Sequence, residues 1–311
     1  MRLVFAGSPD AAVPTLRALA ASSHDVVGVI TREDSPQGRK RVMTPTPVAL
    51  AAQEYGVPVI KANRLDERVD KIVTALEADL GVIVAYGGLV REPLLSRPPF
   101  GWINLHFSLL PRWRGAAPVQ RALMAGDDVT GATVFQLVRE LDAGDVFGRL
   151  TQSIAPGDTA GDLLGSLADS GAELVVRVVD SIARGDARPE PQEGDVTLAP
   201  KLTQADGLVD FDRHPALVSG HIRGVTPEPG AYAEVEGQRL KLLAIAPGLH
   251  EHPLEAGEVV ETDGRILVGT AGAAIELLLV QPAGKKAMAA GDWLRGRQGR
   301  PTRFDAIGGS E

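Results

Sequence analysis

Short apolar runs alternate with amphipathic stretches through the first half of the chain. Short runs typical of strands occupy residues 2–6 and 25–31, and a near-continuous apolar run, as expected of a central parallel strand, occupies residues 80–85. Apolar side chains recur at helical spacing at residues 11–21, 47–55 and 66–77. An alternation of buried strands with amphipathic helices predicts an α/β domain with a mostly parallel sheet.

The pattern continues to residue 184 and then changes. Further strands are predicted at residues 102–107, 131–138 and 146–154, and further helices at 117–125 and 159–184. Residues 185–207 carry prolines and glycines with little periodicity, as an interdomain linker does. Short apolar runs between glycine turns follow at 231–236, 240–246, 257–261, 265–269 and 274–280, with short helices at 216–223 and 290–294. We therefore predict an α/β domain at 1–184, a linker at 185–207 and a small β-barrel domain at 208–311.

The composition of the 311-residue chain is that of a globular protein with a sizeable core. Hydrophobic residues make up 44% of the chain and charged residues 23%, and no run reaches the roughly 18 apolar residues of a membrane helix. The absence of cysteine excludes disulfides and thiolate metal sites, and it is typical of a cytoplasmic protein. A net charge of −8 argues against indiscriminate nucleic-acid binding.

Two polar residues lie near the end of the predicted strand at 102–107. Side chains at i and i+2 share one face of a strand, so Asn104 and His106 point the same way. The carboxyl ends of such strands are where α/β sheets bind ligands. An amide can stabilise an oxyanion and an imidazole can move a proton, whereas Ser108 lacks the G-x-S-x-G setting of a nucleophile. The pair suits a reaction in which the substrate brings its own nucleophile.

Asp142 follows the next predicted strand in a turn-forming Leu-Asp-Ala-Gly-Asp loop. A carboxylate there can orient an imidazole or take a proton through water. Taken singly, an Asn-x-His near a strand end is more often structural, and an Asp in a glycine loop is more often a turn former. Because they lie at the ends of neighbouring strands, Asn104, His106 and Asp142 together are candidate catalytic residues.

Residues 32–46 form a loop too long and too polar for an ordinary strand-to-helix connection. Three basic residues, Arg39, Lys40 and Arg41, lie in it without a negative neighbour between residues 36 and 41. The loop is either a solvated, mobile surface loop or a basic finger that orders on phosphate, to which an arginine can donate two hydrogen bonds.

Three other segments also have two interpretations. Glycines at 87 and 88 form either a tight turn or a place where a ligand approaches the backbone. Trp113 and Arg114 either stack on a base and hold a phosphate or cover apolar side chains. Six basic residues and one acidic residue lie between positions 285 and 303, either as a basic binding face or as a solvated basic tail.

Two motifs resemble the formyltransferase family that uses 10-formyltetrahydrofolate. They are Asn104-Leu-His106-Phe-Ser-Leu-Leu-Pro111-x-x-x-Gly115 and the later Leu-Asp142-x-Gly-Asp. Members of that family act on glycinamide ribotide, on sugar amines or on the amino acid of initiator methionyl-tRNA. The resemblance runs along nearly the whole chain, and Gln-Pro-Ala-Gly-Lys-Lys-x-Met at 281–288 is similar to the members that act on tRNA. It implies a Rossmann-like catalytic domain followed by an OB-like β-barrel domain that binds tRNA.

The resemblance also implies roles for individual residues. Asn104, His106 and Asp142 would be catalytic, and 10-formyltetrahydrofolate would be the formyl donor with no metal required. The residues implied at the folate pocket are Ala85, Tyr86, Gly87, Leu89, Ser108, Leu109, Leu110 and Pro111. The residues implied at the tRNA are Arg39, Lys40, Arg41, Arg114, Lys201, Lys285 and Lys286. Lys40 stands where the family usually has a further glycine after the arginine.

The implied partners are the folate and initiator methionyl-tRNA, with no membrane and no obligate protein partner. A sugar-amine formyltransferase is the nearest alternative, and the basic loop and residues 281–288 favour tRNA over it. A catalytically silent RNA-binding protein is disfavoured by the Asn104, His106 and Asp142 set. A nicotinamide oxidoreductase is disfavoured because only Gly7 of a G-x-G-x-x-G fingerprint is present.

Overall fold

The computed structural model describes residues 1–38 and 40–306. The chain groups into two compact units, and the first consists of Met1–Pro118, Thr130–Gln152 and Leu164–Ala199. The second consists of Val119–Val129, Ser153–Leu163 and Pro200–Glu311. The predicted linker is therefore divided, because its residues up to Ala199 pack with the first unit. The predicted domain boundaries at 184 and 208 stay a prediction.

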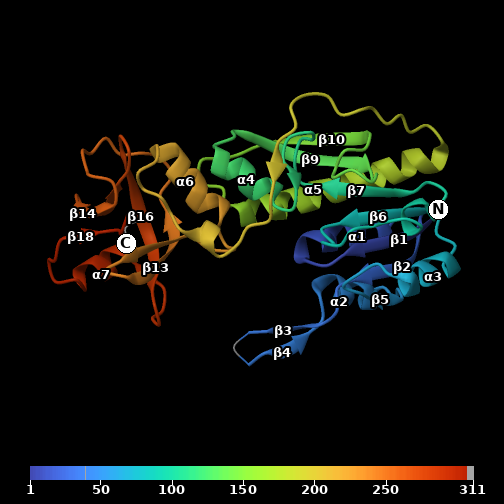
Figure 1. Cartoon of the computed structure of the whole chain (residues 1–311), viewed down its shortest axis with the longest axis horizontal. Helices are drawn as coiled ribbons and strands as arrows, with labels where there is room; N and C mark the ends of the chain where they lie inside the picture. Colours follow the sequence, from blue (N-terminus) through green and yellow to red (C-terminus); the bar gives the residue numbers. More distant parts are fainter. Residues whose placement is uncertain (39, 307–311) are drawn as a thin grey trace. The chain divides into compact units, whose positions relative to one another are not determined.

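The first unit is built on a seven-stranded sheet in the order β10-β9-β7-β6-β1-β2-β5 (Figure 1). Its strands are β1 (Arg2–Gly7), β2 (Asp25–Thr31), β5 (Val59–Lys61), β6 (Leu80–Val84), β7 (Trp102–His106), β9 (Val129–Gln136) and β10 (Val146–Ser153). The pairings from β5 through β2, β1 and β6 to β7 are parallel, and β9 runs antiparallel to β7. The mostly parallel sheet predicted from the apolar runs is confirmed.

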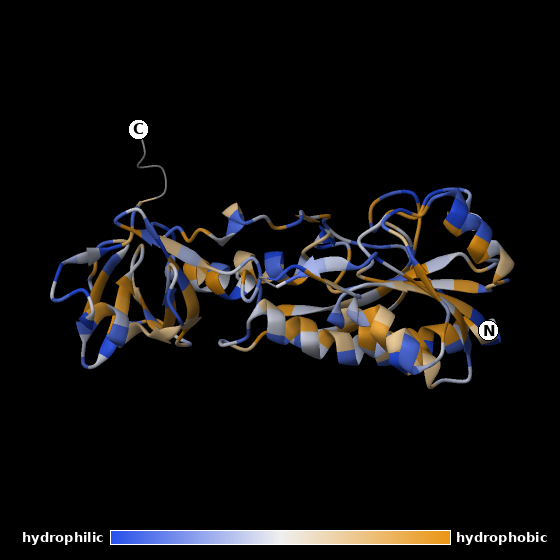
Figure 2. Ribbon diagram, turned by 90° about the horizontal axis from the view of Figure 1, so that it is seen from below, coloured by the Kyte–Doolittle hydropathy of each residue, from blue (hydrophilic) through white to orange (hydrophobic). Residues whose placement is uncertain are grey.

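Helices cover this sheet. They are η1 (Asp10–Ala12), α1 (Val13–Ala20), α2 (Pro47–Glu54), α3 (Glu67–Ala75), η2 (Leu94–Ser96) and α5 (Ala160–Arg184). Helix α4 (Pro118–Ala125) belongs mostly to the second unit. Val69 and Val73 of α3 join Val4 and Trp102 in one buried cluster. Figure 2 shows the central strands largely in the hydrophobic colour. The apolar runs form strands because both faces of the sheet are buried.

Close packing under one tryptophan explains a glycine inside a strand. A Cβ atom added at Gly81 of β6 would lie 2.1 Å from the ring of Trp102 on the neighbouring strand β7. The indole nitrogen of Trp102 donates to the carbonyl of Leu94 at 2.9 Å, so the ring cannot move without losing a buried hydrogen bond. The glycine thus leaves room beside β6 for the indole of Trp102, which belongs to the strand that carries the catalytic candidates.

The strand order of the first unit has a reversal between β1 and β6. The chain proceeds from β1 to β2 and β5 on one side, and then to β6 and β7 on the other. Ligands of such sheets bind outside the carboxyl ends of the strands at this reversal. The loops that leave those ends begin at Ser8, Ala85 and Phe107. The candidate residues after β6 and β7 therefore lie where the topology predicts a site.

Two small pairings were not predicted from the sequence. The basic loop contains an antiparallel hairpin of β3 (Ser35–Gln37) and β4 (Val42–Thr44), and Arg41 has a φ of +50° at its turn. Near the candidate site, β8 (Arg114–Gly115) pairs in parallel with β11 (Leu198–Ala199). Strands of two or three residues carry too few side chains for a periodic signal.

The second unit contains a seven-stranded antiparallel sheet. Its strands are β12 (Tyr232–Val235), β13 (Gln238–Ile245), β14 (Glu258–Thr262), β15 (Arg265–Gly269), β16 (Ala274–Pro282), β17 (Met288–Ala289) and β18 (Thr302–Arg303). The path runs β12-β13-β16-β15-β14-β18, with β17 also on β16. The nitrogen of Asp305 donates to the carbonyl of Glu234 at 2.8 Å, which joins the two ends of this path. This closure supports the predicted barrel.

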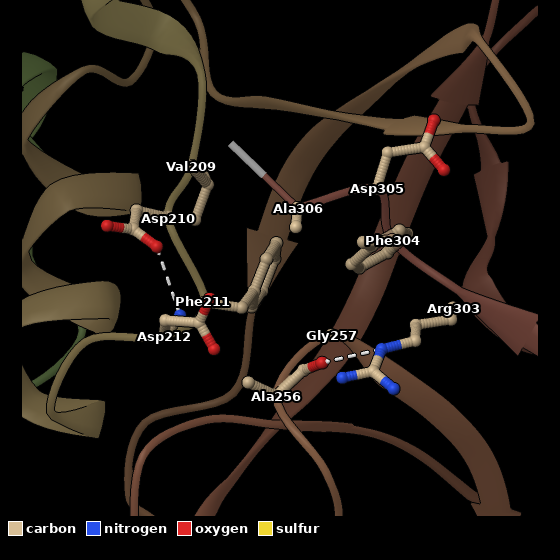
Figure 3. A pocket seen from close by; sticks show the side chains of 10 residues that line it. All are labelled: Val209, Asp210, Phe211, Asp212, Ala256, Gly257, Arg303, Phe304, Asp305 and Ala306. Carbon is tan, nitrogen blue, oxygen red and sulfur yellow. Dashed lines mark hydrogen bonds between the residues drawn. The ribbon is translucent and has the colours of Figure 1, made fainter. Parts of the chain in front are cut away.

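Helices η3 (Ala205–Gly207), α6 (Pro215–Gly224) and α7 (Ala290–Arg295) complete the second unit. A cavity of about 30 Å³ lies between the Phe211 and Phe304 regions (Figure 3). The two rings are 4.9 Å apart between centroids and belong to the core of the unit. The cavity has room for about one water molecule, so it is a packing feature and offers no space for a substrate.

Candidate active site

Asn104 and His106 lie on the same face of β7, as predicted. Asn104 is half-buried and His106 is 6% exposed, whereas Leu105 between them packs near Gly171 of α5 on the other face. No hydrogen-bond partner of the Asn104 side chain is present within residues 1–38 and 40–306. A half-buried amide with unused donors is suited to bind a substrate oxygen.

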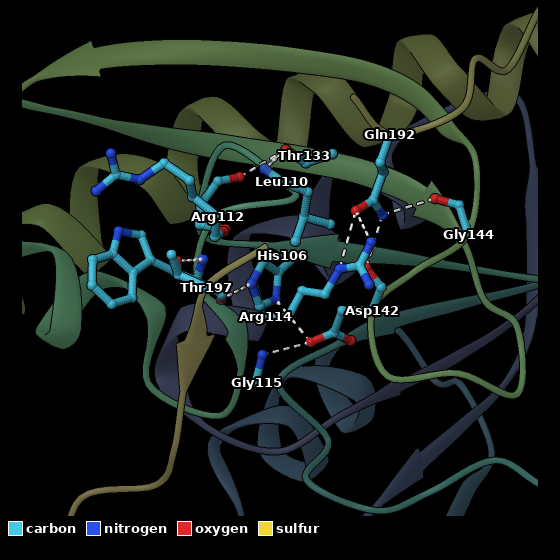
Figure 4. A network of polar contacts seen from close by, with 12 residues as sticks. His106, Leu110, Arg112, Arg114, Gly115, Thr133, Asp142, Gly144, Gln192 and Thr197 are labelled. Carbon is cyan, nitrogen blue, oxygen red and sulfur yellow. Dashed lines mark hydrogen bonds and ion pairs between the residues drawn. The ribbon is translucent and has the colours of Figure 1, made fainter. Parts of the chain in front are cut away.

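The imidazole of His106 is fixed through one nitrogen. Its Nε2 lies 2.8 Å from the carbonyl oxygen of Trp113 (Figure 4). A carbonyl only accepts hydrogen bonds, so Nε2 carries the proton in the neutral ring. Nδ1 is then unprotonated, and it lies 3.8 Å from Oδ2 of Asp142. Phe135 packs edge-on against the ring.

Asp142 is held in place by backbone groups. The nitrogen of Gly115 donates to its Oδ2 at 2.8 Å, and Asp142 itself has a φ of +47°, which is uncommon for a residue with a side chain. Gly115 has a φ of +128°, and a Cβ atom there would lie 2.6 Å from the carbonyl oxygen of Ala199. Glycine at 115 therefore allows the contact that orients the carboxylate.

The electrostatics of the site favour a neutral imidazole. Burial lowers the pKa of His106 below its ordinary value, against the opposing effects of the Asp142 carboxylate and of the hydrogen bond to Trp113. A neutral ring with a free Nδ1 can accept a proton near pH 7. The facing carboxylate then stabilises the imidazolium that forms.

The turn after β7 is held by side-chain hydroxyls. Oγ of Ser108 donates to the carbonyl of Arg112 at 2.7 Å, and Oγ1 of Thr133 donates to the carbonyl of Ser108 at 2.7 Å. Leu110 is buried against Phe135 in a small apolar cluster. Among the residues predicted at the folate, Ser108, Leu110 and Pro111 are thus buried and Leu109 is half-buried. Their contribution to a ligand site is the shape of this turn.

The loop after β6 offers backbone groups for a ligand. Ala85 and Gly87 both have a positive φ, +46° and +76°. The Tyr86 side chain points into the core, where its hydroxyl donates to the carbonyl of Ala62 at 2.6 Å and burial raises its pKa. Arg32 donates to the carbonyls of Tyr86 and Gly87. A ligand here would meet the main chain and the side chain of Leu89, which is 67% exposed.

Two site residues were missed because they lie in the predicted linker. Nε2 of Gln192 donates to the carbonyls of Asp142 and Gly144 at 2.8 and 2.9 Å. Oγ1 of Thr197 accepts from the nitrogen of Trp113 at 2.9 Å. The one available signal was the presence of amide and hydroxyl side chains within a proline-rich stretch, and that signal is weak. The carbonyl of Trp113 could not be predicted, because it belongs to the backbone.

The residues predicted at the tRNA stay a prediction. Lys40, Arg41, Lys201, Lys285 and Lys286 are exposed. Arg114 is half-buried, and its guanidinium donates to Oε1 of Gln192 at 3.2 and 2.6 Å. Arg39 lies outside the described residues.

Within residues 1–38 and 40–306, no helix has the length and apolar character needed to cross a membrane. The same residues contain no group of three or more His, Cys, Asp or Glu side chains placed to hold a metal ion.

A doubly wound sheet with an amide, a neutral imidazole and a carboxylate at its carboxyl edge suits an enzyme that transfers a group to a nucleophile supplied by the substrate. The chain belongs to the formyl transferase family. Residues 1–179 match the formyl transferase domain, and residues 201–298 match the formyl transferase C-terminal domain.

Bacterial relatives match over nearly their full length. The methionyl-tRNA formyltransferase of Clavibacter sepedonicus is 57% identical over 95% of this chain and 97% of its own. That of Leifsonia xyli subsp. xyli is 58% identical over 96% of this chain and 98% of its own. That of Thermobifida fusca is 51% identical over 98% of this chain and 99% of its own.

Solved structures share the fold at low identity. The N-formyltransferase of Helicobacter canadensis in complex with folinic acid and dTDP-3-aminofucose has a TM-score of 0.68 at 16% identity, covering 90% of this chain and 98% of that one. A glycinamide ribonucleotide transformylase of Symbiobacterium toebii has a TM-score of 0.52 at 21% identity, covering 62% of this chain and 94% of that one. These likenesses concern the fold.

Proposed function

We propose that the protein transfers the formyl group of 10-formyltetrahydrofolate to the α-amino group of initiator methionyl-tRNA. The product would be the formylmethionyl-tRNA that starts bacterial translation. The observation that carries the proposal is the arrangement of Asn104, His106 and Asp142, with Nδ1 of His106 free and 3.8 Å from the carboxylate. The relatives named methionyl-tRNA formyltransferase support the acceptor, because they match both units of the chain at more than 50% identity.

The nucleophile is the amine of the substrate. A free α-amine has a pKa of about 7.7–8.0, and the neighbouring ester lowers it, so a useful neutral fraction exists near pH 7. The amine attacks the formyl carbon and negative charge develops on the formyl oxygen. The unused donors of Asn104 can stabilise that charge.

The proton follows a short route through His106. As the new carbon–nitrogen bond forms, the amine loses a proton to Nδ1 of His106. The imidazolium that results is stabilised by Asp142 and can then donate from Nδ1. As the bond from the formyl carbon to N10 of the folate breaks, N10 takes this proton, so that the imidazole is neutral again after each turnover.

The folate would lie at the carboxyl edge of β6 and β7. The positive-φ loop at 85–87 presents backbone groups there, and Leu89 offers an exposed apolar side chain. A pteridine ring carries donors and acceptors along its edge that main-chain amides and carbonyls can bind. The protein residues named here would hold the donor, and no step requires a metal ion.

The tRNA would be held by basic side chains outside the catalytic set. The hairpin of β3 and β4 presents Lys40 and Arg41, and the second unit presents Lys285 and Lys286 at the end of β16. A chain with net charge −8 binds RNA only through such local concentrations of positive charge.

Formyl transfer can be tested directly with labelled donor. The protein is incubated with 10-formyltetrahydrofolate that carries a labelled formyl group, and with charged initiator methionyl-tRNA, free methionine or an amino-sugar nucleotide. Transfer to the tRNA alone is expected. Transfer to the sugar nucleotide alone would keep the account of His106 and overturn the proposed acceptor.

A further inference from the structure

We propose that Gln192 is a positioning residue of this active site, which holds the Asp142 loop and thereby sets where the Asp142 carboxylate lies relative to His106. The inference rests on the function proposed above and adds a residue to its machinery. Gln192 lies in a segment whose sequence is typical of a linker, and its side chain is half-buried beside the catalytic set (Figure 4).

The side-chain amide of Gln192 uses both of its ends. Its nitrogen donates to the carbonyls of Asp142 and Gly144, at 2.8 and 2.9 Å. Its oxygen accepts two hydrogen bonds from the guanidinium of Arg114. Both amide protons are therefore used on one loop, and the charged partner at the other end fixes which way the amide points.

The loop that Gln192 holds needs external support. Asp142 has a φ of +47°, and such a conformation persists in a residue with a side chain only where the surroundings impose it. Gly144 packs so closely that an added Cβ atom would lie 1.8 Å from the carbonyl oxygen of Gln136. Gln192 binds the carbonyls at both ends of this short turn, so removing its two donors frees the backbone that carries the carboxylate.

The segment from Gln192 to Thr197 also supports His106, the partner of Asp142. Thr197 accepts from the nitrogen of Trp113, and the carbonyl of Thr197 accepts from the nitrogen of Arg114 at 2.9 Å. The carbonyl of Trp113 in turn binds Nε2 of His106. The segment from Gln192 to Thr197 thus supports Asp142 at one end and His106 at the other, and a change at Gln192 should move the first without moving the second.

Two variants separate the two ends of the amide. Gln192→Leu removes all four hydrogen bonds at similar size and without charge. Gln192→Glu keeps an acceptor for Arg114 but removes both donors to the loop. Both should lower the turnover number about 10- to 100-fold, as expected when a reacting group is misplaced by about 1 Å. In Gln192→Glu, which keeps an acceptor for Arg114, the KM for tRNA should stay unchanged. The exposed neighbour provides a matched control, Glu193→Gln, which should behave as wild type.

A second readout distinguishes positioning from general destabilisation. Asp142 is the charged group that raises the pKa of His106 against burial. If the carboxylate moves away in Gln192→Leu, the pKa of His106 must fall further. Titration of the ring by NMR measures this, with the His106 signal assigned by its disappearance in His106→Gln. Circular dichroism identifies the folded fraction, and Gln192→Met, which also lacks the four hydrogen bonds and adds no charge, serves if the leucine variant does not fold.

Turnover and the pKa of His106 together decide between the two roles. Lower turnover together with a lower pKa of His106 supports the inference. Lower turnover in proportion to a smaller folded fraction, with the pKa of His106 unchanged, overturns it. If wild-type protein forms no formylmethionyl-tRNA in the same assay, the proposed function fails, and the titration of His106 still tests the positioning.

Discussion

Each compact unit contains a buried histidine, and the two have much in common. His106 ends β7 in the first unit and His221 lies on α6 in the second, with 6% and 9% of their surfaces exposed. In both, Nε2 meets a backbone carbonyl, of Trp113 at 2.8 Å and of Asp206 at 2.7 Å. Burial is the main cause that lowers the pKa of each. Neither burial nor the fixed tautomer therefore marks a catalytic histidine.

The surroundings of the second nitrogen make the difference. A carboxylate, that of Asp142, lies 3.8 Å from Nδ1 of His106, and Asn104 presents unused donors on the same face. Near His221 the guanidinium groups of Arg213 and Arg121 lower its pKa further, against the opposing effect of the Asp206 carboxylate. A nearby anion helps a neutral imidazole to accept a proton, whereas nearby cations oppose it. The carboxylate facing Nδ1 and the Asn104 amide on the same face distinguish His106, the proposed reactive ring, from His221.

The largest expected effect comes from replacing the ring of His106 by an amide, with the same replacement at His221 as the comparison. His106→Gln should lower turnover about 10²- to 10⁴-fold, because the route for the amine proton is removed. Binding of tRNA, measured by filter retention, should not change. His221→Gln should leave turnover unchanged in the labelled-formyl assay. Equal losses from the two substitutions would remove the distinction drawn between them.

The next effect concerns the groups around His106. Asn104→Ala should lower turnover about 10²- to 10³-fold, as removal of one oxyanion donor does. Combined with His106→Gln, it should cost far less than the product of the two single losses, because the residues act as one unit. Single-turnover rates of the two single variants and the double variant test this. A fully multiplicative loss would show that the two side chains act independently.

A smaller effect is expected from the basic residues of the second unit. Replacing Lys285 and Lys286 by alanine should raise the KM for tRNA and leave the turnover number and the pKa of His106 unchanged. The dependence of log affinity on log salt should become shallower by about 0.7 for each phosphate of a single-stranded region that is no longer neutralised. Lys241→Ala, an exposed lysine of β13, is the control. An unchanged salt dependence would contradict the proposed role of the pair.

The smallest effect is a pH dependence of stability. The folded-state pKa of His221 lies below the unfolded value of about 6.5. The stability it contributes is therefore present above about pH 6.5 and is lost as the pH falls through the folded-state pKa, since the unfolded chain then binds more protons. In His221→Gln the free energy of unfolding, measured in urea, should depend less steeply on pH below 6.5. An unaltered dependence would mean that His221 does not titrate in this way.

Much of the fold can be predicted from apolar periodicity. The apolar run at 25–31 predicts a strand with the observed ends, and the helix predicted at 159–184 is observed as Ala160–Arg184. Long elements succeed because many buried side chains repeat the same signal. The shared face of Asn104 and His106 also follows from strand geometry, and the structure confirms it. The role of Arg114 at the tRNA stays a prediction.

The rest of the site depends on tertiary interactions that no periodicity records. The tautomer of His106 is set by a backbone carbonyl, and every residue has one. Gln192 is fifty positions from Asp142 along the chain, and only the folded path of the segment brings them together. In addition, the polar loop at 32–46 gives no periodic signal, yet it contains the β3–β4 hairpin. Short pairings and long-range hydrogen bonds form only in the folded chain, so a local pattern cannot predict them.

The hydrogen bond between Asp305 and Glu234 has a consequence for how the protein tolerates damage. It closes the sheet of the second unit near the last described residues. A chain cut before Thr302 would lose β18 and leave β14 with an unpaired edge, and β12 would lose its hydrogen bond to Asp305. Unpaired edges recruit strands from other molecules. Clipping of the carboxyl-terminal end by a protease should therefore appear first as turbidity in storage, before the proposed catalytic residues of the other unit are affected.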